Sequence, residues 1–150
     1  MALKVAEFKA LEGQVLGVTD WFPIDQPLID RFAEVTQDFQ FIHVDEARAR
    51  ETPLGGTIAH GMLTLSLLPR MAETVVPLPE GLKMGFNYGF DRVRFLNPVR
   101  SGKRVRGRFA LRSVDDSEAD RLKLVLDVTV EIEGEEKPAL VAEWLALHMV

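Results

Sequence analysis

Hydrophobic positions in this chain recur mainly at helical spacing in its first half and alternate with polar positions in its second half. Leu28, Phe32 and Val35 form one apolar stripe. Because their spacing matches one face of a helix, they predict a helix over residues 25–36. A strand over residues 15–22, rich in β-branched and aromatic residues, is predicted before it.

The most apolar stretch follows the pair Gly55–Gly56 and runs from Ile58 to Val75. It is apolar on nearly every helical face, which is typical of a buried helix. Thr57 is expected to cap its start, and Pro69 to kink it. Charged residues interrupt the run, whereas a bilayer-spanning helix needs roughly 20 predominantly apolar residues. We therefore expect a long helix enclosed by the rest of the fold.

The second half predicts four long strands joined by short turns, one of them at residues 115–117. Consecutive strands with short connections favour an antiparallel sheet. The fold class is therefore α+β, with a curled antiparallel sheet wrapped around one long central helix. The predicted strands cover residues 84–96, 103–113, 122–132 and 139–149.

Length and charge limit the classes of function. A chain of 150 residues favours a single domain, residues 1–150. A formal net charge of −5 argues against nucleic-acid partners and against anionic membrane surfaces. The chain has no cysteine, which excludes disulfides and thiol nucleophiles and fits a cytoplasmic protein. Its first ten residues lack the apolar core of a secretion signal.

Chemistry is expected near the start of the apolar helix. Asp38 and His43 lie in an irregular stretch just before it, where a carboxylate and an imidazole are able to share proton transfer. Packing and local capping remain an alternative for both. Gly61 falls in the first helical turn, where free N–H groups would stabilise a developing oxyanion, or where close packing needs a glycine. His60 is read as a core histidine, and His148 as a packing or surface residue.

Two other chemistries receive little support from the sequence. Asp38, His43 and His60 would offer three metal ligands, but no pair of them has the spacing that places two ligands on one helical turn. We therefore expect no metal. Ser66 lacks the Gly-x-Ser-x-Gly pattern of a hydrolase nucleophile, so it is interpreted as a small packing residue.

Two segments together resemble a known family. Residues 38–43, Asp-Phe-Gln-Phe-Ile-His, and residues 55–62, Gly-Gly-Thr-Ile-Ala-His-Gly-Met, resemble the MaoC-like dehydratases, or R-specific enoyl-CoA hydratases, of the hot-dog fold. The branch with nodulation protein N-like members is the most similar. In the family the first segment usually has Asn and Pro at the positions of Gln40 and Phe41. The resemblance covers roughly residues 13–147.

The resemblance implies a mechanism and a set of partners. His43 would be the base that activates a water, Asp38 would position that water and help to protonate the α-carbon, and Gly61 would hold the thioester oxygen. The substrate would be an acyl-CoA or an acyl-carrier thioester of fatty acid metabolism, with no cofactor beyond the coenzyme A of the substrate. A homodimer is implied. The residues implied to contact substrate are Gln40, Ile58, His60 and Asn87.

Three classes of function follow from these residues. The favoured class is a hydratase or dehydratase of trans-2-enoyl thioesters. A hot-dog thioesterase, in which the same water attacks the carbonyl, and a non-catalytic acyl-binding or dimerisation subunit are the alternatives. The basic face of Arg104, Arg106 and Arg108 is interpreted as a solvated strand face, with coenzyme A phosphates as a second candidate for it.

Overall fold

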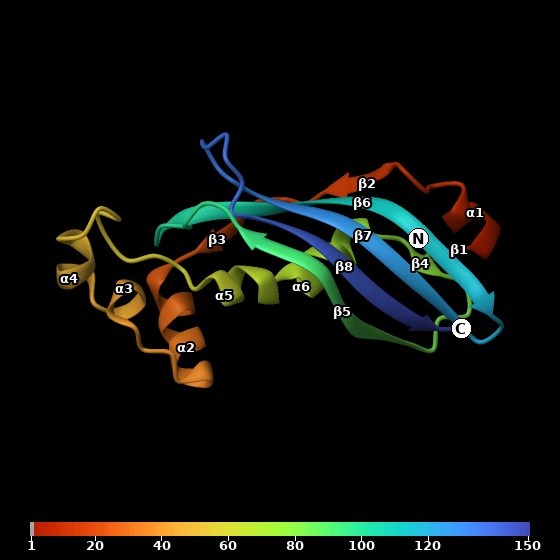
Figure 1. Ribbon diagram of the computed structural model, residues 1–150, viewed down its shortest axis with the longest axis horizontal. Helices are drawn as coiled ribbons and strands as arrows, with labels where there is room; N and C mark the ends of the chain where they lie inside the picture. The colour runs from red at the N-terminus through yellow and green to blue at the C-terminus, as the bar shows by residue number, and fades with distance from the viewer. Residues whose placement is uncertain (1) are drawn as a thin grey trace.

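The computed structural model describes residues 2–150, and a six-stranded antiparallel sheet forms most of it (Figure 1). The strand order is β2–β6–β7–β8–β5, and β3 also pairs with β6. Two very short strands, β1 (Ala2–Leu3) and β4 (Leu78–Pro79), form a separate parallel pair. The strands of the main sheet are β2 (Val15–Val18), β3 (Phe22–Ile24), β5 (Met84–Phe95), β6 (Lys103–Glu118), β7 (Arg121–Ile132) and β8 (Leu140–Met149).

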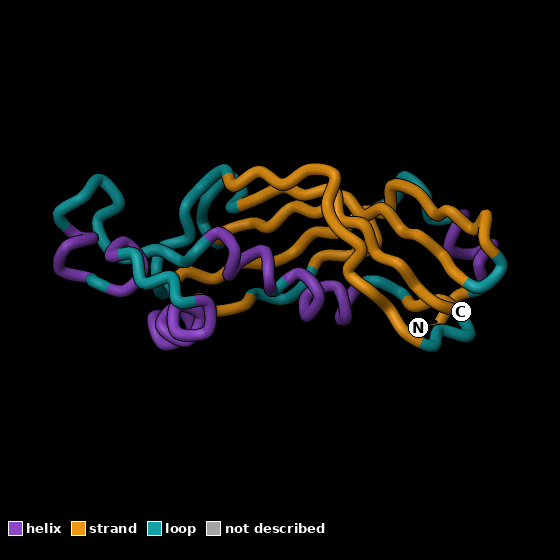
Figure 2. Tube along the Cα trace, turned by 60° about the horizontal axis from the view of Figure 1, so that its bottom comes forward, coloured by secondary structure: helices purple, strands orange, loops and turns teal. Residues whose placement is uncertain are grey.

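Two consecutive helices, α5 (Gly61–Ser66) and α6 (Leu68–Val75), cross one face of this sheet (Figures 1 and 2). Three helices gather at one end of the sheet: α2 (Gln26–Thr36), α3 (Phe41–Val44) and α4 (Glu46–Arg50). Helix α1 (Val5–Lys9) lies at the opposite end, near both termini. Within residues 2–150, every helix is too short or too polar to cross a bilayer.

The core lies between the helices and the sheet. Strand β7 shows why, because its alternating aliphatic residues are each at most 2% exposed and face one side. Leu68 and Met71 of α6 are fully buried in the same core. The predicted α+β arrangement of a helical segment against an antiparallel sheet is therefore confirmed. The buried residues of β7 are Leu122, Leu124, Leu126, Val128, Val130 and Ile132.

The single long helix expected from Ile58 to Val75 is wrong in its start and its continuity. Ile58 forms an isolated β-bridge, so the chain is still extended there and the helix begins at Gly61. Thr57 consequently caps no helix. Pro69 lies in the first turn of α6, where a missing N–H breaks no helical hydrogen bond, so the chain divides into two helices instead of kinking.

The helical segment is also not enclosed on all sides, contrary to expectation. Leu63 and Leu68 are buried against the sheet, but Met62 is 57% exposed on the opposite side of α5. The sheet therefore covers one side of this segment in the single chain.

Smaller differences have local causes. The strand expected over residues 15–22 divides into β2 and β3. Residues 115–117, expected to form a turn, belong to β6, where Asp115 pairs across the hairpin with Lys123. The irregular stretch before the apolar segment contains α3. Helix α4 follows α3, and the Asp45 carboxylate caps it by accepting a hydrogen bond from the Arg48 N–H at 3.2 Å.

Candidate active site

The loop between α2 and α3 carries the first candidate residue. Helix α2 ends at Gln37, whose left-handed φ of 62° turns the chain away from the helix axis. Asp38 follows with an exposed side chain, and its Oδ1 accepts a hydrogen bond from the Gln40 N–H at 3.3 Å. The turn at Gln37 thus places a carboxylate at the open end of the loop, five residues before His43.

His43 lies in α3 and is only 6% exposed. Its Nδ1 lies 2.7 Å from the backbone oxygen of Ile58. Because a carbonyl oxygen only accepts, Nδ1 carries the hydrogen and Nε2 presents a lone pair. Burial lowers the pKa of His43, and the neighbouring His60 lowers it further, while the Ile58 carbonyl and the Asp38 carboxylate oppose this shift. The ring is therefore a neutral base at neutral pH.

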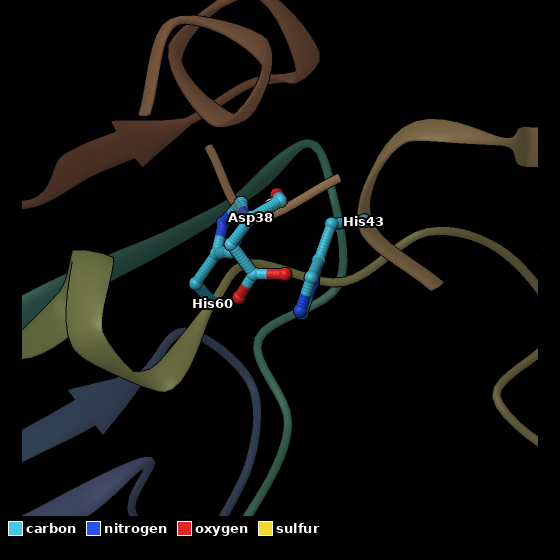
Figure 3. A group of neighbouring side chains, drawn as sticks. All are labelled: Asp38, His43 and His60. Atoms are coloured by element: carbon cyan, nitrogen blue, oxygen red, sulfur yellow. Dashed lines mark hydrogen bonds between the residues drawn. The ribbon is translucent and has the colours of Figure 1, made fainter. Parts of the chain in front are cut away.

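Asp38, His43 and His60 converge on one point, as Figure 3 shows. One donor atom from each lies within 4.8 Å of the others, and the rings of His43 and His60 stack with centroids 3.8 Å apart. A carboxylate and an imidazole lone pair at such distances suit one water molecule and the transfer of its proton. The same three donors would suit a divalent cation, although their sequence spacing did not indicate one.

A cavity of about 190 Å³ opens beside this cluster, lined in part by His43, Ile58 and Gly61. Gly61 begins α5, and the N–H groups of a first helical turn have no acceptor within their helix. A Cβ at position 61 would lie 2.9 Å from Cδ1 of Phe95, so this aromatic ring packs directly on the glycine backbone. Both interpretations of Gly61, close packing and a free backbone donor, therefore apply to the same residue.

A partly buried hydrogen-bond network fixes the backbone around His43. The Thr57 hydroxyl lies 2.7 Å from Oε1 of Gln26 and 2.9 Å from Oε2 of Glu46, and the Thr57 N–H donates to Glu46 at 2.9 Å. That backbone hydrogen bond lowers the pKa of the Glu46 carboxyl. Gln26 also donates from Nε2 to the His43 backbone oxygen at 2.7 Å. Sequence reasoning missed Gln26, Glu46 and this use of Thr57, because nothing in their spacing shows that they meet.

The four residues expected to contact substrate differ in where they lie relative to the cavity beside His43. Ile58 lines the cavity beside His43. His60, like Asp38, lies outside that lining, but His60 is also only 3% exposed, and this burial does not support a direct substrate contact. Gln40 is exposed and forms no side-chain cap for α3. Asn87, on β5, lines other cavities farther along α5 and α6.

The basic face of β6 is occupied by ion pairs. Arg106 and Arg108 both bond to Glu131, at 2.6 and 3.1 Å, and Arg104 pairs with Glu133. A phosphate would have to compete with these carboxylates. The interpretation of this face as a solvated strand face therefore agrees with the structure, and exposed pairs of this kind contribute little to stability.

Comparison with known proteins places these features in a family. Residues 7–133 match the family described as MaoC like domain. Nodulation protein N of Rhizobium meliloti is 51% identical over 146 residues, which cover 97% of this chain and 91% of that protein. A Mycobacterium tuberculosis protein named 3-hydroxyacyl-thioester dehydratase Z is 44% identical over 145 residues, which cover 97% and 95% of the two chains. The solved (R)-hydratase of A. caviae shares the fold, with a TM-score of 0.74 at 22% identity over 89% of this chain and 95% of that one.

Proposed function

The chain belongs to the MaoC-like dehydratase family and has its hot-dog fold, and from this premise we propose that it adds water to trans-2-enoyl thioesters to give R-3-hydroxyacyl thioesters. Its activity is that of a hydratase or dehydratase on thioester substrates, and it is therefore a hydro-lyase. The observation that carries the finer proposal is the cluster of an exposed Asp38 carboxylate and a buried, neutral His43 beside the start of α5.

In the proposed mechanism, Asp38 and His43 hold one water. Nε2 of His43 takes a proton from that water while its oxygen bonds to the β-carbon of the enoyl group. The electrons of the double bond move toward the thioester oxygen, and the Gly61 N–H stabilises the negative charge that forms there. A proton then passes to the α-carbon with the participation of Asp38, which leaves His43 neutral again. Dehydration is the same sequence in reverse.

Three apolar cavities support a path for the acyl chain. Beyond the cavity beside His43, one of about 290 Å³ lies against Ser66, and one of about 530 Å³ lies against α6. These two share Pro69, Asn87 and Trp144, so they are neighbours between the helices and β5. We place the acyl chain of the substrate along this path. Asn87 would then contact the acyl chain and not the thioester group.

The edge of the sheet supports a homodimer. Strand β5 ends the sheet order and carries large apolar side chains that are 38–64% exposed. A long apolar edge strand is a template for pairing with another chain, and we propose that two copies pair along β5. We also propose a cytoplasmic location, on the cysteine-free composition alone. The exposed apolar residues of β5 are Met84, Phe86, Tyr88, Phe90 and Phe95.

Sedimentation analysis tests the dimer. The purified chain is expected to have twice the mass of one 16.8 kDa chain at micromolar concentration. A variant with Phe86→Lys and Tyr88→Lys should sediment as a monomer, because charged side chains on an edge strand oppose its pairing with another chain. Val35→Lys serves as the matched control, since Val35 is 84% exposed on α2, away from β5. A double variant that remains fully dimeric would place the interface elsewhere.

Turnover of crotonyl-CoA tests the reaction. We expect the absorbance of the conjugated double bond to fall on adding enzyme, at the same rate with and without EDTA, because the carboxylate and imidazole supply the acid–base chemistry. The product should be the R-3-hydroxy thioester on chiral chromatography. Release of free thiol in the same cuvette would indicate a thioesterase. Loss of activity in EDTA that zinc restores would assign the three-residue cluster to a metal.

The dependence of kcat/KM on pH tests the state of the base. Because burial lowers the pKa of His43 below 6.5, the base is unprotonated at and above neutral pH. We therefore expect full activity at neutral pH and an acid limb below 6.5, where falling pH protonates Nε2. Burial also lowers the pKa of His148, and His148→Gln is expected to leave that limb in place. A limb above 6.5 would contradict the assignment of a buried base.

A further inference from the structure

The structure assigns to His60 a positioning role in the hydration reaction, an inference that rests on the function proposed above. His60 is 3% exposed, and it lies outside the lining of the cavity beside His43, although its neighbours Ala59 and Gly61 belong to that lining. A substrate in the cavity therefore meets other groups first. His60 acts on the reaction through the residues that it contacts.

The first of these contacts is the backbone of Asp38. Nε2 of His60 lies 3.1 Å from the Asp38 carbonyl oxygen. Since that oxygen only accepts, Nε2 carries the hydrogen, and in the neutral ring Nδ1 then has only a lone pair. Nδ1 is buried and has no hydrogen-bond partner within residues 2–150. The ring is thus fixed as one tautomer that donates to the Asp38 loop.

The second contact is the ring of His43. The two imidazoles stack with an interplanar angle of 25°, and the ring of Phe32 packs on His60 with centroids 4.9 Å apart. The plane of the His43 ring determines where its Nε2 lone pair points. His60 therefore supports that plane from one side, while the Ile58 carbonyl holds Nδ1.

One buried side chain consequently touches both members of the catalytic pair. The Asp38 carboxylate is exposed on a loop, so a hydrogen bond to its own backbone limits how far the carboxylate moves from His43. His60 is also the residue before Gly61 and the N-cap position of α5. His60 therefore fixes the positions of the Asp38 loop, the His43 ring and the Gly61 N–H relative to one another. A misplacement of about 1 Å in such a site costs on the order of 10²-fold in rate.

Two substitutions of His60 distinguish the effect of its hydrogen bond to Asp38 from the effect of its stacking on His43. His60→Phe keeps a flat ring against His43 but removes the hydrogen bond, so kcat for crotonyl-CoA should fall about 100-fold with KM within about twofold. His60→Gln keeps an N–H that reaches the Asp38 carbonyl but removes the stack, so kcat should fall about 10-fold or less. Phe32→Leu is the packing control, with an expected kcat within about threefold of the unmodified chain.

The outcomes distinguish this role from its alternatives. A kcat for His60→Phe within about twofold of the unmodified chain would reduce His60 to a packing residue. A rise of KM by about 10-fold at unchanged kcat would make it a substrate contact. If the unmodified chain hydrates crotonyl-CoA, either result overturns only the positioning role of His60. If the unmodified chain is inactive, the proposed function itself is overturned. Where His60→Phe fails to fold by circular dichroism, His60→Asn replaces it, because its shorter amide leaves the Asp38 carbonyl unbonded, and the same limits apply.

Discussion

Substitution of Asp38 by Asn is expected to lower kcat for enoyl-CoA hydration by about 10³-fold, within the usual contribution of a general acid or base. Oδ1 of the new side chain still accepts the Gln40 N–H, so the loop keeps its local hydrogen bond. What is lost is the negative charge and the ability to exchange a proton. The measurement is steady-state turnover of crotonyl-CoA, with circular dichroism to confirm an unchanged fold.

The companion variant and the control make this prediction specific. His43→Asn retains an N–H near the position of Nδ1 that donates to the Ile58 carbonyl, but it lacks the Nε2 lone pair, so its loss of kcat should match that of Asp38→Asn. Glu34→Gln removes another exposed carboxylate, on α2, and should leave kcat unchanged. Near-full turnover by either Asp38→Asn or His43→Asn would show that the reaction uses a different pair.

Local patterns predicted the parts of this fold whose structure depends on local or repeating interactions. The alternation in β7 indicated its buried face, because every second residue is aliphatic and the period of a strand is two. The start of α5 was not predictable in this way. Ile58 and Ala59 are held extended by partners about 40 positions later: Ile58 forms a β-bridge with Arg100, and the Ala59 N–H donates to the Val99 oxygen at 2.8 Å. A local sequence pattern spans far fewer residues, so it does not include these partners.

The same distinction applies to the site. Asp38 and His43 were proposed because both lie in an irregular stretch just before the apolar segment and because the two segments resemble a family. The stacking of His60 on His43 and its bond to the Asp38 carbonyl depend on how α3 packs against the start of α5. The network of Gln26, Glu46 and Thr57 likewise joins three separate segments. Sequence therefore indicated the proposed reacting groups, but not the contacts of the residues that hold them in place.

Gly61→Ala is expected to lower kcat by about 10²-fold, comparable to the loss of an oxyanion donor, although the variant keeps its backbone N–H. The physical reason is the ring of Phe95, whose Cδ1 lies 2.9 Å from the position of the new Cβ, too close for two carbon atoms. Either Phe95 or the first turn of α5 must move, and both line the cavity beside His43. Stability should change little, because alanine favours a helix over glycine by roughly 0.5–1 kcal/mol and so offsets part of the strain.

The double variant Gly61→Ala with Phe95→Ala tests whether the clash is the cause. With the ring removed, the new methyl group has room, the first turn of α5 returns to its place, and kcat should recover to within about 10-fold of the unmodified chain. Phe95→Ala alone serves as the reference for the loss of the cavity wall. Because the Gly61 N–H is present in all of these chains, recovery would mean that its position decides the rate. A double variant as slow as Gly61→Ala alone would show that the methyl group itself blocks the thioester.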